Sequence, residues 1–173
     1  MRRRLSLASV IVLTACLWTG NAAATILQFD ASLDGFQEVP PNFLAGSGDG
    51  TLFLNDATGD YTISGSFSDL YSPTTAAHIH GPALPGIDGV IIHGLTIPPL
   101  IIAGVYSGAN TFTGPQMAEL IAGLYYVNIH SIIYPNGEIR GQLTLVPEPA
   151  SAVLLALGGI AAITVARRRR RAN

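Results

Sequence analysis

Apolar and polar residues alternate along much of the stretch from residue 25 to residue 146. Every second side chain is apolar over residues 27–34, and the same period recurs over residues 61–68. Because successive side chains of a strand point to opposite faces, this period predicts strands with one buried and one solvated face. Further runs with strand composition are 50–55, 76–80, 90–93, 101–106, 125–133 and 138–145.

Turn and helix signals separate these runs. Residues 56–60 form a link of hairpin length, and Pro135-Asn136-Gly137 joins the last two runs. Residues 113–123 predict one short helix, with Pro115 in its first turn and Gly123 as its end. Many short strands with one helix predict an all-β fold, either a single antiparallel β-sandwich or a Greek-key barrel.

The N-terminal stretch has the pattern of a secretory signal peptide over residues 1–24. Three arginines precede an apolar run over residues 5–18, and three alanines end at Ala24. The alternative is a lipoprotein signal, in which Cys16 is acylated and an acyl chain anchors the protein. If the cut follows Ala24, the remaining chain has no cysteine and no internal disulfide.

The C-terminal stretch has the pattern of a membrane anchor. An apolar run over residues 150–166 lies between Pro147-Glu148-Pro149 and five arginines at residues 167–171. A helix of that length spans about 25 Å, and the arginines are expected to stay in the cytoplasm. The predicted division is therefore a signal peptide (1–24), an exported β domain (25–146) and a C-terminal segment (147–173).

Charge is unevenly distributed between these parts. Residues 25–146 hold ten acidic residues and a single basic one, Arg140, which gives a net charge of −9. Such a domain is unsuited to binding nucleic acid or anionic lipid.

Three histidines are the candidate metal ligands. His78 and His80 are separated by one residue, so they point to the same side of a strand, and His130 lies in another predicted strand. Three imidazoles suit zinc or copper and leave a coordination position open. The alternative is that these histidines are buried and hydrogen-bonded to loop carbonyls or acidic side chains. His93 is expected to be structural or exposed.

Arg140 is expected to form a structural ion pair with Glu38 or Glu138, and the alternative is that it binds an anionic ligand.

We identify no Gly-x-Ser-x-Gly elbow, phosphate loop or dinucleotide fingerprint, so no nucleophilic catalysis is expected. The His-x-His pair is weakly similar to the copper ligands of Cu/Zn superoxide dismutase. Because the bridging histidine and the aspartate of that site are not evident, we assign no dismutase activity.

Four motifs in order resemble the CHRD domain, over about residues 27–145. The resemblance implies an extracellular all-β module without a settled molecular activity. The motifs are Leu33-Asp34-Gly35 with Glu38-Val39-Pro40-Pro41, then residues 77–83, residues 124–130 and residues 135–142.

The C-terminal segment resembles the PEP-CTERM sorting signal of Gram-negative bacteria, which has a Pro-Glu-Pro motif, a membrane helix and an arginine cluster. The resemblance implies transient anchoring in the inner membrane and removal of the tail by an exosortase. The expected function is that of a non-enzymatic module of the cell surface or extracellular matrix that binds protein or polysaccharide. The alternative is a zinc- or copper-binding protein, or a metal-dependent redox protein, that uses the three histidines.

Overall fold

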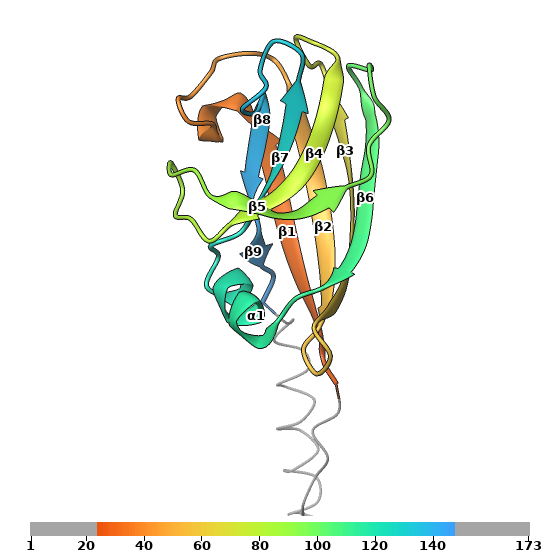
Figure 1. The fold of residues 1–173 in the computed structure, drawn as a ribbon, viewed down its shortest axis with the longest axis vertical. Coiled ribbons are helices and arrows are strands. Elements are labelled where there is room, and N and C mark those ends of the chain that lie inside the picture. Colours follow the sequence, from red (N-terminus) through yellow and green to blue (C-terminus); the bar gives the residue numbers. More distant parts are fainter. Residues whose placement is uncertain (1–23, 148–173) are drawn as a thin grey trace, which may run out of the picture.

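The computed structural model describes residues 24–147, which form one antiparallel sheet wound almost into a closed barrel (Figure 1). The predicted signal peptide, membrane helix and arginine cluster lie outside the described residues, apart from Ala24. Within residues 24–147 no helix is long and apolar enough to cross a membrane. The strands are β1 (Ile26–Asp34), β2 (Ser47–Asn55), β3 (Asp60–Ser68), β4 (Thr74–Gly81), β5 (Val90–Leu95), β6 (Gly104–Thr111), β7 (Tyr126–Ser131), β8 (Ile139–Gln142) and β9 (Thr144–Leu145).

The sheet has the strand order β5-β4-β7-β8-β1-β2-β3-β6, and β9 pairs with β1. Its two edges approach each other where an isolated bridge joins Thr96, just after β5, to Ser107 of β6. The two hydrogen bonds of this bridge are 2.7 Å and 2.9 Å long. The all-β prediction is confirmed, and of the two predicted architectures the structure has the barrel-like one.

The alternation in the sequence corresponds to the inside and outside of the barrel. Phe29 and Leu33 of β1 are buried, as are Tyr61 and Ile63 of β3, while Thr62 between them is exposed. Burial of such side chains stabilises the fold by roughly 1.5–3 kcal/mol each. The fully buried core residues are Phe29, Leu52, Leu54, Ile79, Leu120, Tyr125, Val127, Ile129, Ile139 and Leu143.

The predicted helix is α1 (Gly114–Ile121), which lies near one end of the barrel (Figure 1). Thr113 and Gln116 form a capping box at its N-terminus, and Pro115 lies in its first turn. Gly123 follows the helix with φ of +73°, a conformation that favours glycine.

Several strand ends differ from the predicted ranges, and the largest difference is at β6. Residues 101–106 were expected to be a strand, but β6 begins at Gly104 and continues to Thr111. The carbonyl oxygens of Ile102 and Ile101 instead accept hydrogen bonds from the backbone of Leu70, in a loop, and of Thr74, the first residue of β4. Residues 107–111 have weak strand propensity, and they are extended because β3 offers them a continuous antiparallel partner.

The outer faces of β4, β7 and β8 carry polar side chains that three loops cover, namely residues 35–46, 82–89 and 132–137. Ala77, Ile79, Val127, Ile129 and Ile139 of these strands point into the core. The intervening side chains therefore point outward, yet most of them are buried. We call this set the outer polar layer, and it consists of His78, His80, Tyr126, Asn128, His130, Arg140 and Gln142.

Truncation of a core side chain far from the outer polar layer should destabilise the barrel. Leu52→Ala removes a fully buried side chain of β2 and is expected to lower the free energy of unfolding by about 2–5 kcal/mol in urea titrations. Val105→Ala on β6, where the valine is 64 % exposed, should cost less than about 1 kcal/mol. Similar losses in the two variants would contradict this assignment of the core.

Candidate metal centre

Strands β4 and β7 bring the three predicted ligands together on the outside of the barrel. In the antiparallel pairing His78 is opposite Asn128 and Ala76 is opposite His130, so His130 is a diagonal neighbour of His78. His130 Nε2 lies 3.0 Å from His78 Nδ1 and 3.4 Å from His80 Nε2. One ring nitrogen from each histidine falls within 4.8 Å of the other two.

The remaining ring nitrogens of two of these histidines bond to loop carbonyls. His80 Nδ1 lies 3.0 Å from the Gly89 carbonyl oxygen, and His130 Nδ1 lies 3.0 Å from that of Pro135. A carbonyl only accepts, so Nδ1 carries the proton in both rings. In a neutral imidazole Nε2 is then an unprotonated acceptor, which is the form that binds a metal.

This arrangement leaves His80 Nε2 and His130 Nε2 facing each other with two lone pairs and no hydrogen between them. Burial lowers the pKa of His80, and it lowers the pKa of His130 to about 4, so both rings are neutral at neutral pH. Burial likewise lowers the pKa of His78. If His78 Nδ1 carries a proton it donates to His130 Nε2 at 3.0 Å, and His80 Nε2 still faces that nitrogen without a hydrogen between them. A cation between the three rings would serve all three nitrogens. Tetrahedral zinc with bonds of 2.0–2.1 Å requires ligand nitrogens about 3.3 Å apart, close to the two observed separations.

One side of the three-histidine cluster is open to a hollow of about 240 Å³. His80 and His130 line it together with Tyr126 and Asp88. An ion held by three imidazoles would therefore have room for a water molecule or another ligand in its remaining position.

Tyr126 supports this cluster from one side. Its ring stacks on His80 with centroids 5.2 Å apart and an interplanar angle of 13°. The Arg140 guanidinium carbon lies 3.5 Å from the centroid of the Tyr126 ring, and the Tyr126 hydroxyl accepts a hydrogen bond of 3.0 Å from Gly89 N. Tyr126 thus holds both the His80 ring and the loop whose carbonyl orients it.

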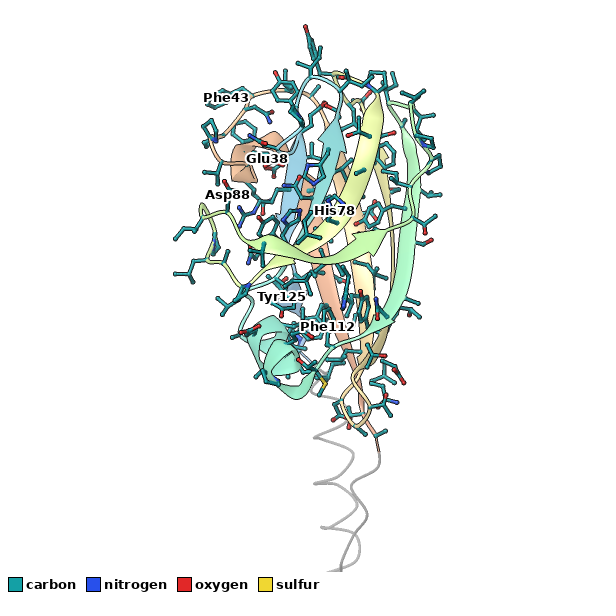
Figure 2. The ribbon with its side chains drawn as sticks, viewed as in Figure 1. Glu38, Phe43, His78, Asp88, Phe112 and Tyr125 are labelled. Atoms are coloured by element: carbon teal, nitrogen blue, oxygen red, sulfur yellow. The ribbon has the colours of Figure 1, made fainter. Side chains whose placement is uncertain are left out.

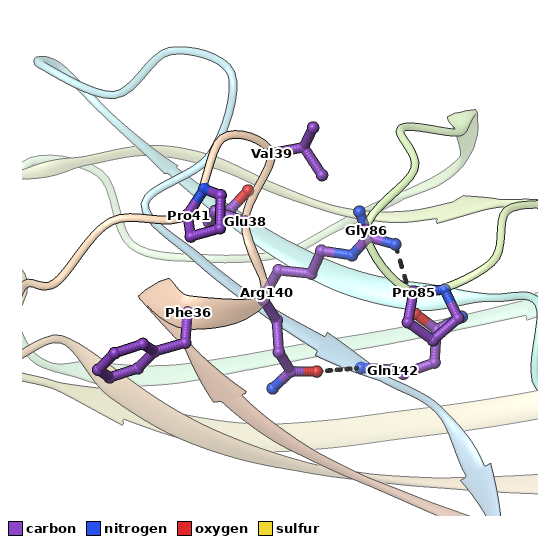
Figure 3. A pocket seen from close by; sticks show the side chains of 9 residues that line it. Phe36, Glu38, Val39, Pro41, Pro85, Gly86, Arg140 and Gln142 are labelled. Atoms are coloured by element: carbon purple, nitrogen blue, oxygen red, sulfur yellow. Dashed lines mark hydrogen bonds between the residues drawn. The ribbon is translucent and has the colours of Figure 1, made fainter.

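The structure corrects the expected partner of Arg140. Among residues 24–147, Asp88 is the only carboxylate within 4.0 Å of its guanidinium, at 3.8 Å, and neither Glu38 nor Glu138 pairs with it. Figure 3 shows the Arg140 side chain between Pro41 and Glu38 on one side and Pro85 and Gly86 on the other. Arg140 donates to the carbonyl oxygens of Ile87 and Leu84 at 2.9 Å and 3.4 Å.

Glu138 is occupied elsewhere. Its carboxylate accepts from Tyr71 N and, at 2.5 Å, from Ser131 Oγ. It precedes β8, so the alternation that was expected to place it beside Arg140 does not extend to it.

His93 was expected to be structural or exposed, and the structure places it against Tyr61. Its Nδ1 lies 2.8 Å from the Tyr61 hydroxyl, and its ring stacks on the Tyr61 ring.

Tyr126 and Asn128 were not predicted from the sequence as part of the site, although the alternation of side chains along a strand places both on the same face as His130. Asp88 lies in a Gly- and Pro-rich loop that has no period, but in space it belongs to the same side of the molecule as Glu38 and His78 (Figure 2).

Arg140 is expected to be a structural residue that holds the 82–89 loop. Arg140→Ala would remove the side-chain donor to the carbonyl oxygens of Ile87 and Leu84 and leave a cavity where the buried side chain lay, so the free energy of unfolding should fall by about 2–4 kcal/mol. Arg140→Lys keeps the charge but loses the planar fork, and an intermediate loss is expected. Thermal melts would measure both, and a loss under about 0.5 kcal/mol for the alanine variant would contradict the role.

Comparisons with known families agree with the sequence motifs. A model of the CHRD domain matches residues 29–143, and a model of the PEP-CTERM protein-sorting motif matches residues 145–171. No curated protein and no solved structure matches the chain. The two resemblances are therefore confirmed, and the chain belongs to the CHRD domain family and carries a PEP-CTERM sorting motif.

Proposed function

We propose that this chain is an exported CHRD module that binds a zinc or copper ion through His78, His80 and His130. The observation that carries the proposal is the 3.4 Å approach of His80 Nε2 to His130 Nε2, two acceptors whose protons lie on the opposite side of each ring. Two facing acceptors are unfavourable without a positive species between them. The separations of His130 Nε2 from the other two ligand nitrogens match the spacing of a small tetrahedral ion, and all three ligand nitrogens lie within 4.8 Å of one another.

Three imidazoles suit both zinc and copper, so the donor set alone does not distinguish the two ions. The hollow beside His80 and His130 leaves room for one exogenous ligand. Bound zinc would act as a structural or ligand-binding centre. Bound copper in such an open site would also permit a redox role, which is the second candidate function.

The sorting motif supports a location at the cell surface. In this proposal signal peptidase cuts after Ala24, the segment over residues 150–166 holds the chain in the inner membrane, and an exosortase removes the tail. The barrel then acts outside the cell without catalysing a reaction, through contacts with a surface protein or an exopolysaccharide. The net charge of −9 over residues 25–146 favours neutral or cationic partners.

Metal analysis tests the three-histidine centre. The full chain, purified in mild detergent without a histidine tag, is expected to contain about one zinc or copper ion per molecule by mass spectrometry of the metal. The double variant His78→Ala/His80→Ala should lose that ion because only one imidazole remains. Wild type with metal should also melt at a higher temperature than wild type after chelation, because the ion binds only the folded state.

His93→Ala is the matched control for this measurement. It removes an imidazole from the neighbouring strand β5 that bonds to Tyr61 rather than to the cluster, so the metal content should be unchanged. A folded wild-type chain that neither contains zinc or copper nor takes up either ion when supplied would contradict the proposal.

Deletion of the tail tests the sorting proposal. A chain that ends at residue 146 should still be exported, but it should not be retained at the membrane or processed by an exosortase. Immunoblots of cell fractions would compare its position and size with those of the full chain. A tail-deleted chain found in the same fraction and at the same size as the processed wild type would contradict the proposal.

A further inference from the structure

Asn128 of the outer polar layer and Glu38 of the covering 35–46 loop each have an acceptor oxygen without a hydrogen-bond donor. Glu38 lies in the 35–46 loop and is 5 % exposed, and Asn128 of β7 is 2 % exposed. Within residues 24–147, Glu38 Oε1 and Asn128 Oδ1 are the two buried side-chain polar atoms that have no hydrogen-bond partner. Both atoms are acceptors in an ionised carboxylate and an amide, and leaving either one unsatisfied is costly.

These two oxygens lie together against Gly137. A Cβ at this position would collide with both Asn128 Oδ1 and Glu38 Oε1, and the φ of Gly137 is +135°. Glycine thus leaves the space in which the two side chains meet.

The orientation of the Asn128 amide is determined by the covering hairpin. Asn128 Nδ2 donates to the Asn136 carbonyl oxygen at 3.3 Å. A rotation of the amide by half a turn would bring Oδ1 against that carbonyl and lose the hydrogen bond. In this orientation Oδ1 lies with Glu38 Oε1 against Gly137 and requires a donor there.

We propose that Glu38 is a protonated carboxylic acid whose hydroxyl donates a hydrogen bond to Asn128 Oδ1. One proton then satisfies both unpartnered oxygens at once. An ionised Glu38 would instead place a negative charge beside the negative end of the amide dipole. The charged and titratable groups that face Glu38 are Arg140 from β8, Asp88 from the 82–89 loop and Tyr126 from β7.

The electrostatics of the buried carboxyl agree with this assignment. Burial raises the pKa of Glu38 from its usual 4.5 to about 7, and this effect outweighs the opposing influences of Arg140, of the Asn128 amide and of the Val39 backbone N–H. Asp88 raises the pKa further. The protonated form therefore predominates below about pH 7.

The proposed hydrogen bond makes the attachment of the 35–46 loop depend on pH. Below pH 7 it ties this loop to Asn128, and Asn128 in turn holds the 132–137 hairpin. Above pH 7 the carboxylate loses that contact and is attracted to Arg140, which shares with it a pocket of about 360 Å³ (Figure 3). This inference concerns residues outside the three-histidine cluster and does not depend on metal binding.

The test is the pH dependence of thermal unfolding in the full chain and in Glu38→Gln. The native state holds a proton that the unfolded chain releases above pH 4.5, so wild-type stability falls as pH rises toward and through 7. Wild type is expected to lose roughly 3–6 °C in Tm from about pH 6 to about pH 8.5. The glutamine amide donates to Asn128 Oδ1 at every pH, so Glu38→Gln should show a smaller loss and exceed wild type at the alkaline end.

Glu119→Gln is the matched control, since Glu119 accepts a hydrogen bond from the Tyr125 hydroxyl that a glutamine oxygen also accepts. It should retain the wild-type dependence on pH. The same dependence in Glu38→Gln as in wild type would overturn the proposal. Carbon NMR of wild type labelled at glutamate carboxyls gives an answer even if Glu38→Gln does not fold, because a Glu38 titration midpoint near 4.5 would also overturn it, and a midpoint near 7 is expected.

Discussion

Polar side chains that are buried between a barrel wall and its covering loops must each find a hydrogen-bond partner, and the outer polar layer is built around this requirement. Arg140 meets it with the carbonyls of Leu84 and Ile87, which fastens the 82–89 loop. Gln142 meets it with the carbonyls of Ala83 and Gly123. The loops that cover the layer are thus ordered by the same side chains that they bury.

Two places in the layer lack sufficient protein donors. His80 Nε2 and His130 Nε2 are two ring acceptors that face each other, and Glu38 Oε1 and Asn128 Oδ1 are two unpartnered oxygens that both lie against Gly137. We propose a metal ion for the first place and a proton for the second. The physical problem is the same in both places, because two acceptor atoms with lone pairs need a positive species between them. The size and basicity of the acceptors decide whether that species is a metal ion or a proton.

Much of the fold could be predicted from the sequence, because the alternation of apolar and polar residues shows which face of each strand points into the barrel and which points outward. The same alternation also placed His78 and His80 on one face, and the register of β4 against β7 brings His130 beside them. The partner of Arg140 could not be predicted in this way. Asp88 belongs to a loop whose path depends on packing over the barrel, and Glu138 lies one residue before the strand whose alternation would have placed it.

The described chain enters and leaves the barrel at the same end, along β1 and β9 (Figure 1). These strands are antiparallel and share only a short ladder, from Phe29–Leu145 to Asp30–Thr144. A force that draws residues 24 and 147 apart would act across this ladder and break its hydrogen bonds one after another, rather than load them together in shear. The barrel is therefore mechanically weak between its own ends, and it suits attachment through one end only.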